Sequence, residues 1–219
     1  MDVYTTENEQ IEDLKKWWKE NWKSLIAGII IGLSAIFAYW AWQNHTRSQA
    51  EAASAEYQLL ISAVEKADAR AGFEHAARIR NQYGETSYAV FAAMAMAKLS
   101  LDKGDKKAAR QHLEWAMNNA EHETMRHIAR LRLARVLLDM GQAQAALKLV
   151  ATQKTGGFLA AYEEVKGDIY VKTAQVKEAD IAYRRALKAL EGQPNPDKKA
   201  LLQMKIDDLG NSPAQEKST

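Results

Sequence analysis

Residues 166–190, KGDIYVKTAQVKEADIAYRRALKAL, decide the fold of this 219-residue chain. Two apolar segments with helical periodicity flank a short turn at Ala174, so the stretch predicts a pair of helices. Small and large residues occur in this stretch at the relative spacings of a tetratricopeptide repeat. They are Gly167, Tyr170, Ala179, Tyr183 and Ala186. Small residues let paired helices approach closely, while the tyrosines fill the space between neighbouring pairs.

The same arrangement recurs along the preceding hundred or so residues. The predicted turn residues, 32, 37 and 33 residues apart, are Gly72, Gly104, Gly141 and Ala174. The alanines five positions after them are Ala77, Ala109, Ala146 and Ala179. This spacing is typical of the tetratricopeptide repeat, in which one helix pair cannot bury its apolar face alone and several pairs must stack.

Local signals set the limits of this repeat domain. Asp105 is a predicted helix N-cap, and Asn195-Pro196 supplies a cap and a first-turn proline for a last helix that ends at Gly210. No segment shows sustained strand alternation. The fold class is therefore expected to be all-α, with about four helix pairs plus a C-terminal helix over residues 51–210. Residues 211–219 read as a disordered tail.

Residues 24–42, SLIAGIIIGLSAIFAYWAW, are 19 consecutive uncharged residues ahead of the repeats. A helix of that length is about 28 Å long, close to the hydrocarbon thickness of a bilayer. Five of the six tryptophans lie within residues 17–42, near the two ends of the stretch, as expected for side chains at the headgroup level. The stretch predicts a single transmembrane helix.

Two alternatives compete with this interpretation. A buried core helix would have no reason for aromatic residues at both ends. A cleaved signal peptide fits Ala50-Glu51-Ala52 as a small-x-small cleavage site. However, a signal peptide has only about 7–15 apolar residues, which is shorter than this stretch. We therefore expect an uncleaved signal anchor, followed by a juxtamembrane linker over residues 43–50.

Lysine and arginine counts on the two sides predict the orientation of the anchor. The amino side carries four lysines, Lys15, Lys16, Lys19 and Lys23. Over residues 43–62 the carboxyl side carries only Arg47. Residues 1–23 are therefore expected in the cytoplasm. The repeat domain is expected on the outer side of a single-pass anchor, which is the periplasm if the cell is Gram-negative.

Small residues recur every fourth position inside the predicted span, at Ser24, Gly28 and Gly32. Such a stripe lets another helix backbone approach closely. Glycine is also simply common in membrane helices, and both interpretations remain open.

The order of these features resembles the YfgM family of ancillary subunits of the SecYEG translocon. The residues that carry the resemblance are EDLKKWWKENWK, the GIIIG of the anchor, LSLDKGDKKAARQHLEWA and KGDIYVKTAQVKEADIAYRRAL. The resemblance implies an inner-membrane protein that works beside the membrane-anchored chaperone PpiD and helps newly exported client polypeptides. None of these motifs is a catalytic signature.

Several motifs resemble those of enzymes, but their spacing or surroundings do not match a catalytic site. His122-Glu123 and His127 are spaced by five residues, whereas a helical zinc site needs histidines four apart. Ser100-Leu101-Asp102-Lys103 and Lys154-Thr155-Gly156 match two motifs of penicillin-binding enzymes, but no sheet and no third motif accompany them. We expect no enzyme activity and no cofactor.

Composition excludes further classes. The chain has no cysteine, so it has no disulfide, thiolate metal site or cysteine nucleophile. A net charge of +2 is too small to suggest a nucleic-acid partner.

Recognition of a protein segment is the chemistry that remains. The first helix of each pair lines the concave side of such a stack. The apolar residues placed there are Phe91, Met94, Ile128 and Leu131. The charged residues at equivalent later places are Lys66, Lys98, Arg135 and Asp168. These side chains form either a protein-binding face or, alternatively, ordinary inter-helix core with a solvated rim.

The function expected from the sequence is a non-catalytic membrane subunit whose helical repeats bind a protein partner and client chains at the translocon. A membrane-anchored scaffold for another envelope complex fits the residues equally well. A divergent cell-wall enzyme that uses Ser100 is the alternative from a different class.

Overall fold

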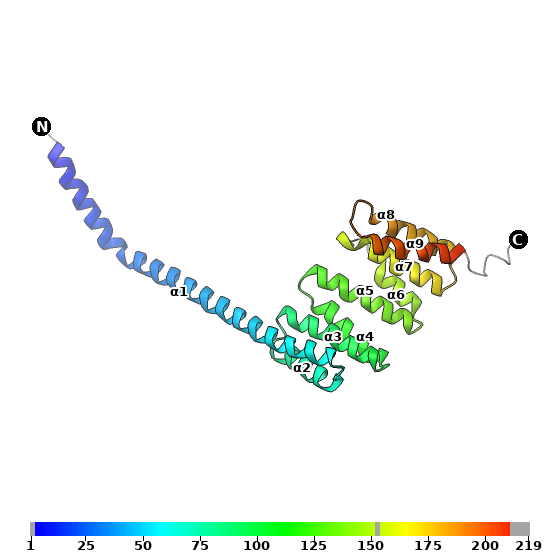
Figure 1. The fold of residues 1–219 in the computed structure, drawn as a ribbon. Helices are drawn as coiled ribbons and strands as arrows, with labels where there is room; N and C mark the ends of the chain where they lie inside the picture. The colour runs from blue at the N-terminus through cyan, green and yellow to red at the C-terminus, as the bar shows by residue number, and fades with distance from the viewer. Residues whose placement is uncertain (1–2, 152–153, 211–219) are drawn as a thin grey trace. The chain divides into compact units, whose positions relative to one another are not determined.

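The computed structural model describes residues 3–151 and 154–210, so the predicted tail at 211–219 lies outside the described residues. The described chain is all-α, without strands, as the sequence predicted (Figure 1). It divides into two units, residues 1–51 and 52–219, each of which is described by itself. The helices are α1 (Val3–Glu65), α2 (Ala69–Gln82), α3 (Ser87–Asp102), α4 (Lys106–Asn119), α5 (Glu123–Asp139), α6 (Ala143–Val150), α7 (Leu159–Lys172), α8 (Val176–Ala189) and α9 (Pro196–Gly210), with a 3₁₀ turn η1 (Gly156–Phe158) before α7.

The described residues of the first unit belong to α1 alone. Residues 43–50, which we expected as a linker, are also helical. They contain neither glycine nor proline. The Thr46 hydroxyl donates to the carbonyl of Trp42 at 2.9 Å, and Arg47 pairs with Glu51 at 2.8 Å, both one turn apart. These contacts are compatible with an unbroken helix.

The second unit consists of four helix pairs and a final helix, as predicted (Figure 1). Residues 52–65 of α1 pack on α2, where Leu60 shares an apolar cluster with Ala76 and Ile79 and Glu56 contacts His75 at 2.7 Å. The other pairs are α3 with α4, α5 with α6, and α7 with α8, while α9 packs on α8. Apolar residues from successive pairs form one continuous core over α3 to α7. Two smaller clusters lie at the ends, around Leu60 and Ile79 and around Tyr183 and Leu202.

One kind of turn joins the two helices of every pair. The second residue after each first helix has a positive φ, and these residues are Ala67 (56°), Gly104 (78°), Gly141 (76°) and Ala174 (59°). The next residue in each turn donates its N–H to the carbonyl five positions back, as Asp105 does to Ser100 at 2.8 Å. This is the Schellman arrangement, which satisfies the last carbonyls of a helix. The predicted cap by Asp105 is confirmed, since its carboxylate accepts from the Ala108 amide at 2.9 Å.

The turn predicted at Gly72 is wrong. That turn lies at Ala67, and Gly72 lies inside α2, where it is buried. A Cβ on Gly72 would lie 2.8 Å from Cδ1 of Leu99, so only glycine fits without a shift. Gly72 thus takes the place that we had assigned to Ala77, the small residue five positions after a turn. With this correction, 37 residues separate Ala67 from Gly104 and Gly104 from Gly141.

The corrected register reveals an exchange of side-chain size within the pairs. In each pair, one buried residue lies seven positions before the turn residue and another lies nine positions after the turn residue. These two residues contact each other or belong to the same apolar cluster. The four couples are Leu60 with Ala76, Ala97 with Leu113, Ala134 with Val150, and Gly167 with Tyr183. In the last three couples the first helix supplies the small residue, and in the first couple it supplies the large one. Each couple fills a similar space in a different way.

An ion-pair network fastens the last helix to α7. The Glu164 side chain, 5% exposed, pairs with Lys198 and, at 3.0 Å, with Lys205 of α9. Lys205 also contacts Asp168 at 2.6 Å. The start of α9 agrees with the sequence, because the Lys198 amide donates to the Asn195 side chain at 3.3 Å.

Candidate functional site

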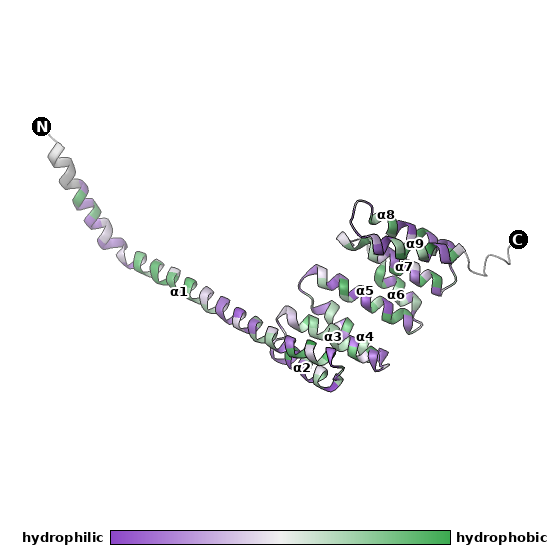
Figure 2. Ribbon diagram, in the orientation of Figure 1, coloured by the Kyte–Doolittle hydropathy of each residue, from purple (hydrophilic) through white to green (hydrophobic). Residues whose placement is uncertain are grey.

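The first unit presents an apolar surface over the predicted span. Among the described residues, one helix is long and apolar enough to cross a membrane, judged by length and composition. Its hydrophobic residues gather along the middle of α1 (Figure 2). The tryptophans at both ends of residues 24–42 are exposed, among them Trp18 and Trp40. These properties fit a membrane-anchored protein.

The predicted helix-contact stripe is open within this unit. Ser24, Gly28 and Gly32 are exposed, and nothing lies within 4 Å of a Cβ built on either glycine. The stripe therefore has space for another helix, and contact with one remains a prediction.

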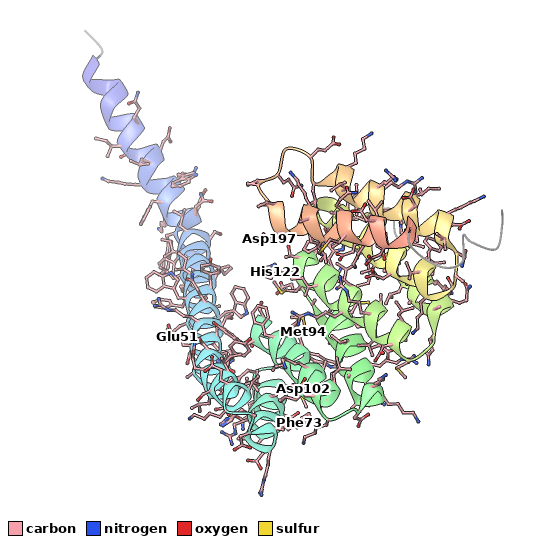
Figure 3. The ribbon with its side chains drawn as sticks, turned by 45° about the vertical axis from the view of Figure 1, so that its right-hand side comes forward. Glu51, Phe73, Met94, Asp102, His122 and Asp197 are labelled. Atoms are coloured by element: carbon pink, nitrogen blue, oxygen red, sulfur yellow. The ribbon has the colours of Figure 1, made fainter. Side chains whose placement is uncertain are left out.

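The second unit carries a hollow of about 510 Å³ between α3, α4 and α5, which we call the larger hollow. Its apolar lining consists of Met94, Ala97, Leu101, Leu113 and Val136. Its charged rim consists of Lys98, Asp102, Arg132, Arg135 and Asp139. Figure 3 labels Met94 and Asp102, which lie along α3.

A smaller hollow of about 270 Å³ adjoins it, between α1, α3 and α5. Its lining consists of Tyr57, Phe91, Met94, Ala95, Lys98, Met125, Ile128 and Arg132. The rings of Tyr57 and Phe91 are 5.9 Å apart, and Tyr88 packs against both. Because Met94, Lys98 and Arg132 line both hollows, the two form one surface, which we call the groove.

Five of the eight residues expected on a binding face line this groove. They are Phe91, Met94, Ile128, Lys98 and Arg135. Because the first helices of two successive repeats supply them, the repeat register placed them on one surface.

The other three residues lie elsewhere. Leu131 is 4% exposed and belongs to the core, because its side of α5 packs against neighbouring helices. Lys66 lies in the turn after α1. Asp168 accepts a hydrogen bond from the Tyr183 hydroxyl at 2.8 Å and pairs with Lys205. Its carboxylate is therefore engaged in holding α7, α8 and α9 together.

Sequence reasoning missed several residues of the groove, among them Tyr57 and Arg132. Tyr57 was overlooked because the turn at Ala67 was misplaced, which shifted the register of the first repeat. Arg132 was overlooked because the sequence analysis placed the preceding residue, Leu131, on the concave face, whereas Leu131 is buried and Arg132 lines the groove.

The motifs that resembled catalytic sites have structural roles. The Ser100 side chain is buried, and its hydroxyl donates to the carbonyl of Met96 at 2.8 Å. A buried hydroxyl that is already bonded to its own helix does not suit a nucleophile. The Lys154-Thr155-Gly156 motif leads into the η1 turn, and the described residues form no strand there.

The two histidines differ in environment. His122 is exposed at the start of α5. His127 is half-buried, with its Nδ1 2.8 Å from the Tyr162 hydroxyl and its ring stacked on Phe158. Burial, helped by the charge of Arg130, lowers the pKa of His127. Among the described residues, no group of three histidine or carboxylate side chains is placed to hold a metal ion.

Comparisons with known proteins agree with this architecture. A family model described as a tetratricopeptide repeat-like domain matches residues 15–211. A protein of Escherichia coli K12 named an ancillary SecYEG translocon subunit is 31% identical over 95% of this chain and 99% of its own length. Proteins of the same name align from Neisseria gonorrhoeae, 28% identical over 95% of this chain, and from Haemophilus influenzae, 39% identical over 44% of this chain. The Haemophilus alignment spans about half of that relative, 47% of its length.

Proposed function

The chain belongs to the YfgM family of ancillary SecYEG translocon subunits, and on that premise we propose that it is a non-catalytic, membrane-anchored subunit that binds protein segments through its groove. The observation that carries the proposal is the groove itself. It is a hollow whose apolar floor consists largely of buried core side chains and whose rim is charged, and it lies in a domain whose fold serves recognition of protein segments.

The proposed topology places residues 1–23 in the cytoplasm and residues 51–210 in the periplasm of a bacterial inner membrane. Its support is the excess of lysine on the amino side of residues 24–42, against Arg47 alone within residues 43–62 on the other side. The exposed tryptophans at the two ends of the span suit the two interfaces.

The proposed mechanism is tethering combined with surface complementarity. The anchor confines the repeat domain to the membrane plane, which raises its effective concentration near chains that leave the translocon. The proposed partners are SecYEG, the membrane-anchored chaperone PpiD and exported client polypeptides in a chaperone-like role. The relatives' names support SecYEG, and resemblance to the family supports the other two.

Site-specific photocrosslinking in cells tests this function. A photoreactive phenylalanine analogue at position 91 lies in the groove, while one at position 181 replaces Ile181, an exposed apolar residue of α8. Purification in mild detergent is expected to recover SecYEG with both variants, the one labelled at position 91 and the one labelled at position 181. Crosslinks to PpiD or to exported chains are expected from position 91 only.

Other outcomes contradict the proposal. Crosslinks from position 181 that equal or exceed those from position 91 would mean that the groove is not the binding surface. Recovery of another envelope complex in place of SecYEG would favour the scaffold alternative.

A further inference from the structure

The charges around the groove do not cancel. Lys98 pairs with Asp102 at 2.7 Å, so these two rim residues neutralise each other. Asp139 pairs with Lys106 at 2.6 Å, outside the rim. Both carboxylates of the rim are therefore already compensated. The two remaining rim charges, Arg132 and Arg135, are both positive.

Arg135 is weakly engaged. Its guanidinium lies 3.9 Å from Glu164, and that carboxylate is already held by Lys198 and Lys205. Arg132 is exposed and makes no ion pair or hydrogen bond with the described residues. The two arginines are three positions apart on α5, which places them on the same side of the helix.

Arg132 stands where the two hollows meet. Apolar surface extends on both sides of it, toward Leu101 and Val136 in the larger hollow and toward Phe91 and Ile128 in the smaller one. The larger hollow, about 510 Å³, falls within the range of about 300–1,000 Å³ typical of ligand pockets. An arginine fork at such a place is suited to bind a carboxylate in a bidentate manner.

We infer that the groove selects acidic polypeptide segments, in which a bulky apolar side chain enters the larger hollow while a neighbouring carboxylate binds Arg132. This inference rests on the proposed function and adds the chemistry of the segment to it. Charge complementarity favours an anionic segment, because the uncompensated rim charge is positive. A basic segment would instead bring its own cations against Arg132 and Arg135.

The test uses the full chain in phosphatidylcholine nanodiscs and three short rhodamine-labelled peptides. Each peptide has a central Leu-Phe, flanked by glutamate, glutamine or lysine. Fluorescence anisotropy is expected to show the glutamate peptide binding about fivefold more tightly than the glutamine peptide, and the lysine peptide binding least. The preference is expected to disappear at about 0.5 M salt, because the arginines are exposed.

Two variants test whether Arg132 causes the preference for the glutamate peptide. Arg132→Gln is expected to reduce the preference for glutamate to less than about twofold, with unchanged thermal unfolding. Arg185→Gln removes an exposed arginine of α8, outside the groove, and is expected to keep the full preference. Equal loss in both variants would mean a general effect of net charge and would overturn the inference.

Further outcomes separate this inference from the proposed function. If the three peptides bind equally, or if none binds while position 91 still crosslinks to exported chains, the acidic preference is wrong and the binding function stands. If crosslinking at position 91 also fails, both are wrong. If phosphatidylglycerol vesicles compete with the glutamate peptide as well as the unlabelled peptide does, the groove binds lipid and the inference is overturned. If the chain self-associates and Arg132→Gln relieves this, the groove binds a second copy and the inference is likewise overturned.

Discussion

The backbone of Gly167 on α7 lies against the aromatic ring of Tyr183 on α8, so closely that a Cβ at Gly167 would overlap the ring. The ring cannot easily move aside, because Tyr183 is 3% exposed and its hydroxyl donates to Asp168 at 2.8 Å. Burial and the neighbouring Asp168 raise the pKa of Tyr183, so the hydroxyl stays protonated and able to donate.

Gly167→Ala is expected to destabilise the repeat domain by about 2 kcal/mol. Overpacking costs about 1–3 kcal/mol, and the better helix propensity of alanine recovers part of it. Chemical unfolding followed by circular dichroism measures the change. In a Tyr183→Ala background the overlap is absent, so the same substitution should become neutral or stabilising; an unchanged penalty there would place its cause elsewhere.

Ala174→Gly is expected to stabilise the domain by about 1 kcal/mol, because alanine at a φ of 59° has a left-handed conformation that glycine adopts without strain. Ala145→Gly, at an exposed position inside α6, is the matched control. That control should lose about 1 kcal/mol through helix propensity. Changes of the same sign in both variants would contradict the strain argument.

Leu131→Ser and Phe91→Ser are expected to separate folding from binding. Leu131 is buried in the core, so its loss should cost about 3 kcal/mol of the free energy of unfolding. Phe91 is only partly buried and lines the smaller hollow, so its loss should cost less than about 1.5 kcal/mol and mainly weaken peptide binding. Similar unfolding midpoints for the two variants would show that Phe91 is a core residue.

The attachment of α9 is expected to depend on pH through Glu164. Burial alone would raise the pKa of Glu164, but hydrogen bonds and charges from Lys198 and Lys205 outweigh it and lower the pKa below its usual 4.5. The stabilisation is therefore complete above about pH 4.5 and is lost as the pH falls through the lowered pKa.

Glu164→Gln should accordingly destabilise the domain by about 2 kcal/mol at pH 7, and the difference from the wild type should shrink at pH 3. Thermal unfolding at a series of pH values measures this. Glu178→Gln, at an exposed position of α8, should show a small difference at every pH. A Glu164→Gln penalty that is constant with pH would exclude ionisation as its cause.

The topology can be read directly because the chain has no cysteine. Single substitutions Thr6→Cys and Ser48→Cys place one thiol on each side of residues 24–42. In intact cells, a membrane-impermeant maleimide that enters the periplasm is expected to label position 48 and to leave position 6 unlabelled until the cells are lysed. The reverse result would invert the proposed orientation.

The sequence predicted the repeats well where a turn residue and the small residue after it agreed. Gly104 and Gly141 mark real turns because their positive φ favours glycine. The first repeat misled us because Gly72 is needed for close packing inside α2, whereas the nearby turn uses Ala67. A glycine has the same appearance in a sequence whether it serves backbone conformation or close approach.

The groove was harder to predict, because α5 is apolar on more than one side. Ile128 and Leu131 are three residues apart, yet the first lines the smaller hollow and the second is buried. Helical periodicity shows that a face is apolar, but it does not show whether a neighbouring helix covers that face. The ion pair of Asp168 with Lys205 was equally difficult to predict, since the two residues are 37 positions apart in the sequence.

The exchange of side-chain size among the four couples limits how this domain can be recombined. In the first pair the first helix supplies the larger side chain, Leu60, against Ala76. In the last pair the second helix supplies the larger side chain, Tyr183, against Gly167. A chimera that joined the first helix of the first pair to the second helix of the last pair would bring leucine against tyrosine, and the reciprocal chimera would bring glycine against alanine. One product would be overfilled and the other would contain a void, so single helices are not expected to exchange between these two pairs, whereas whole helix pairs keep each couple matched.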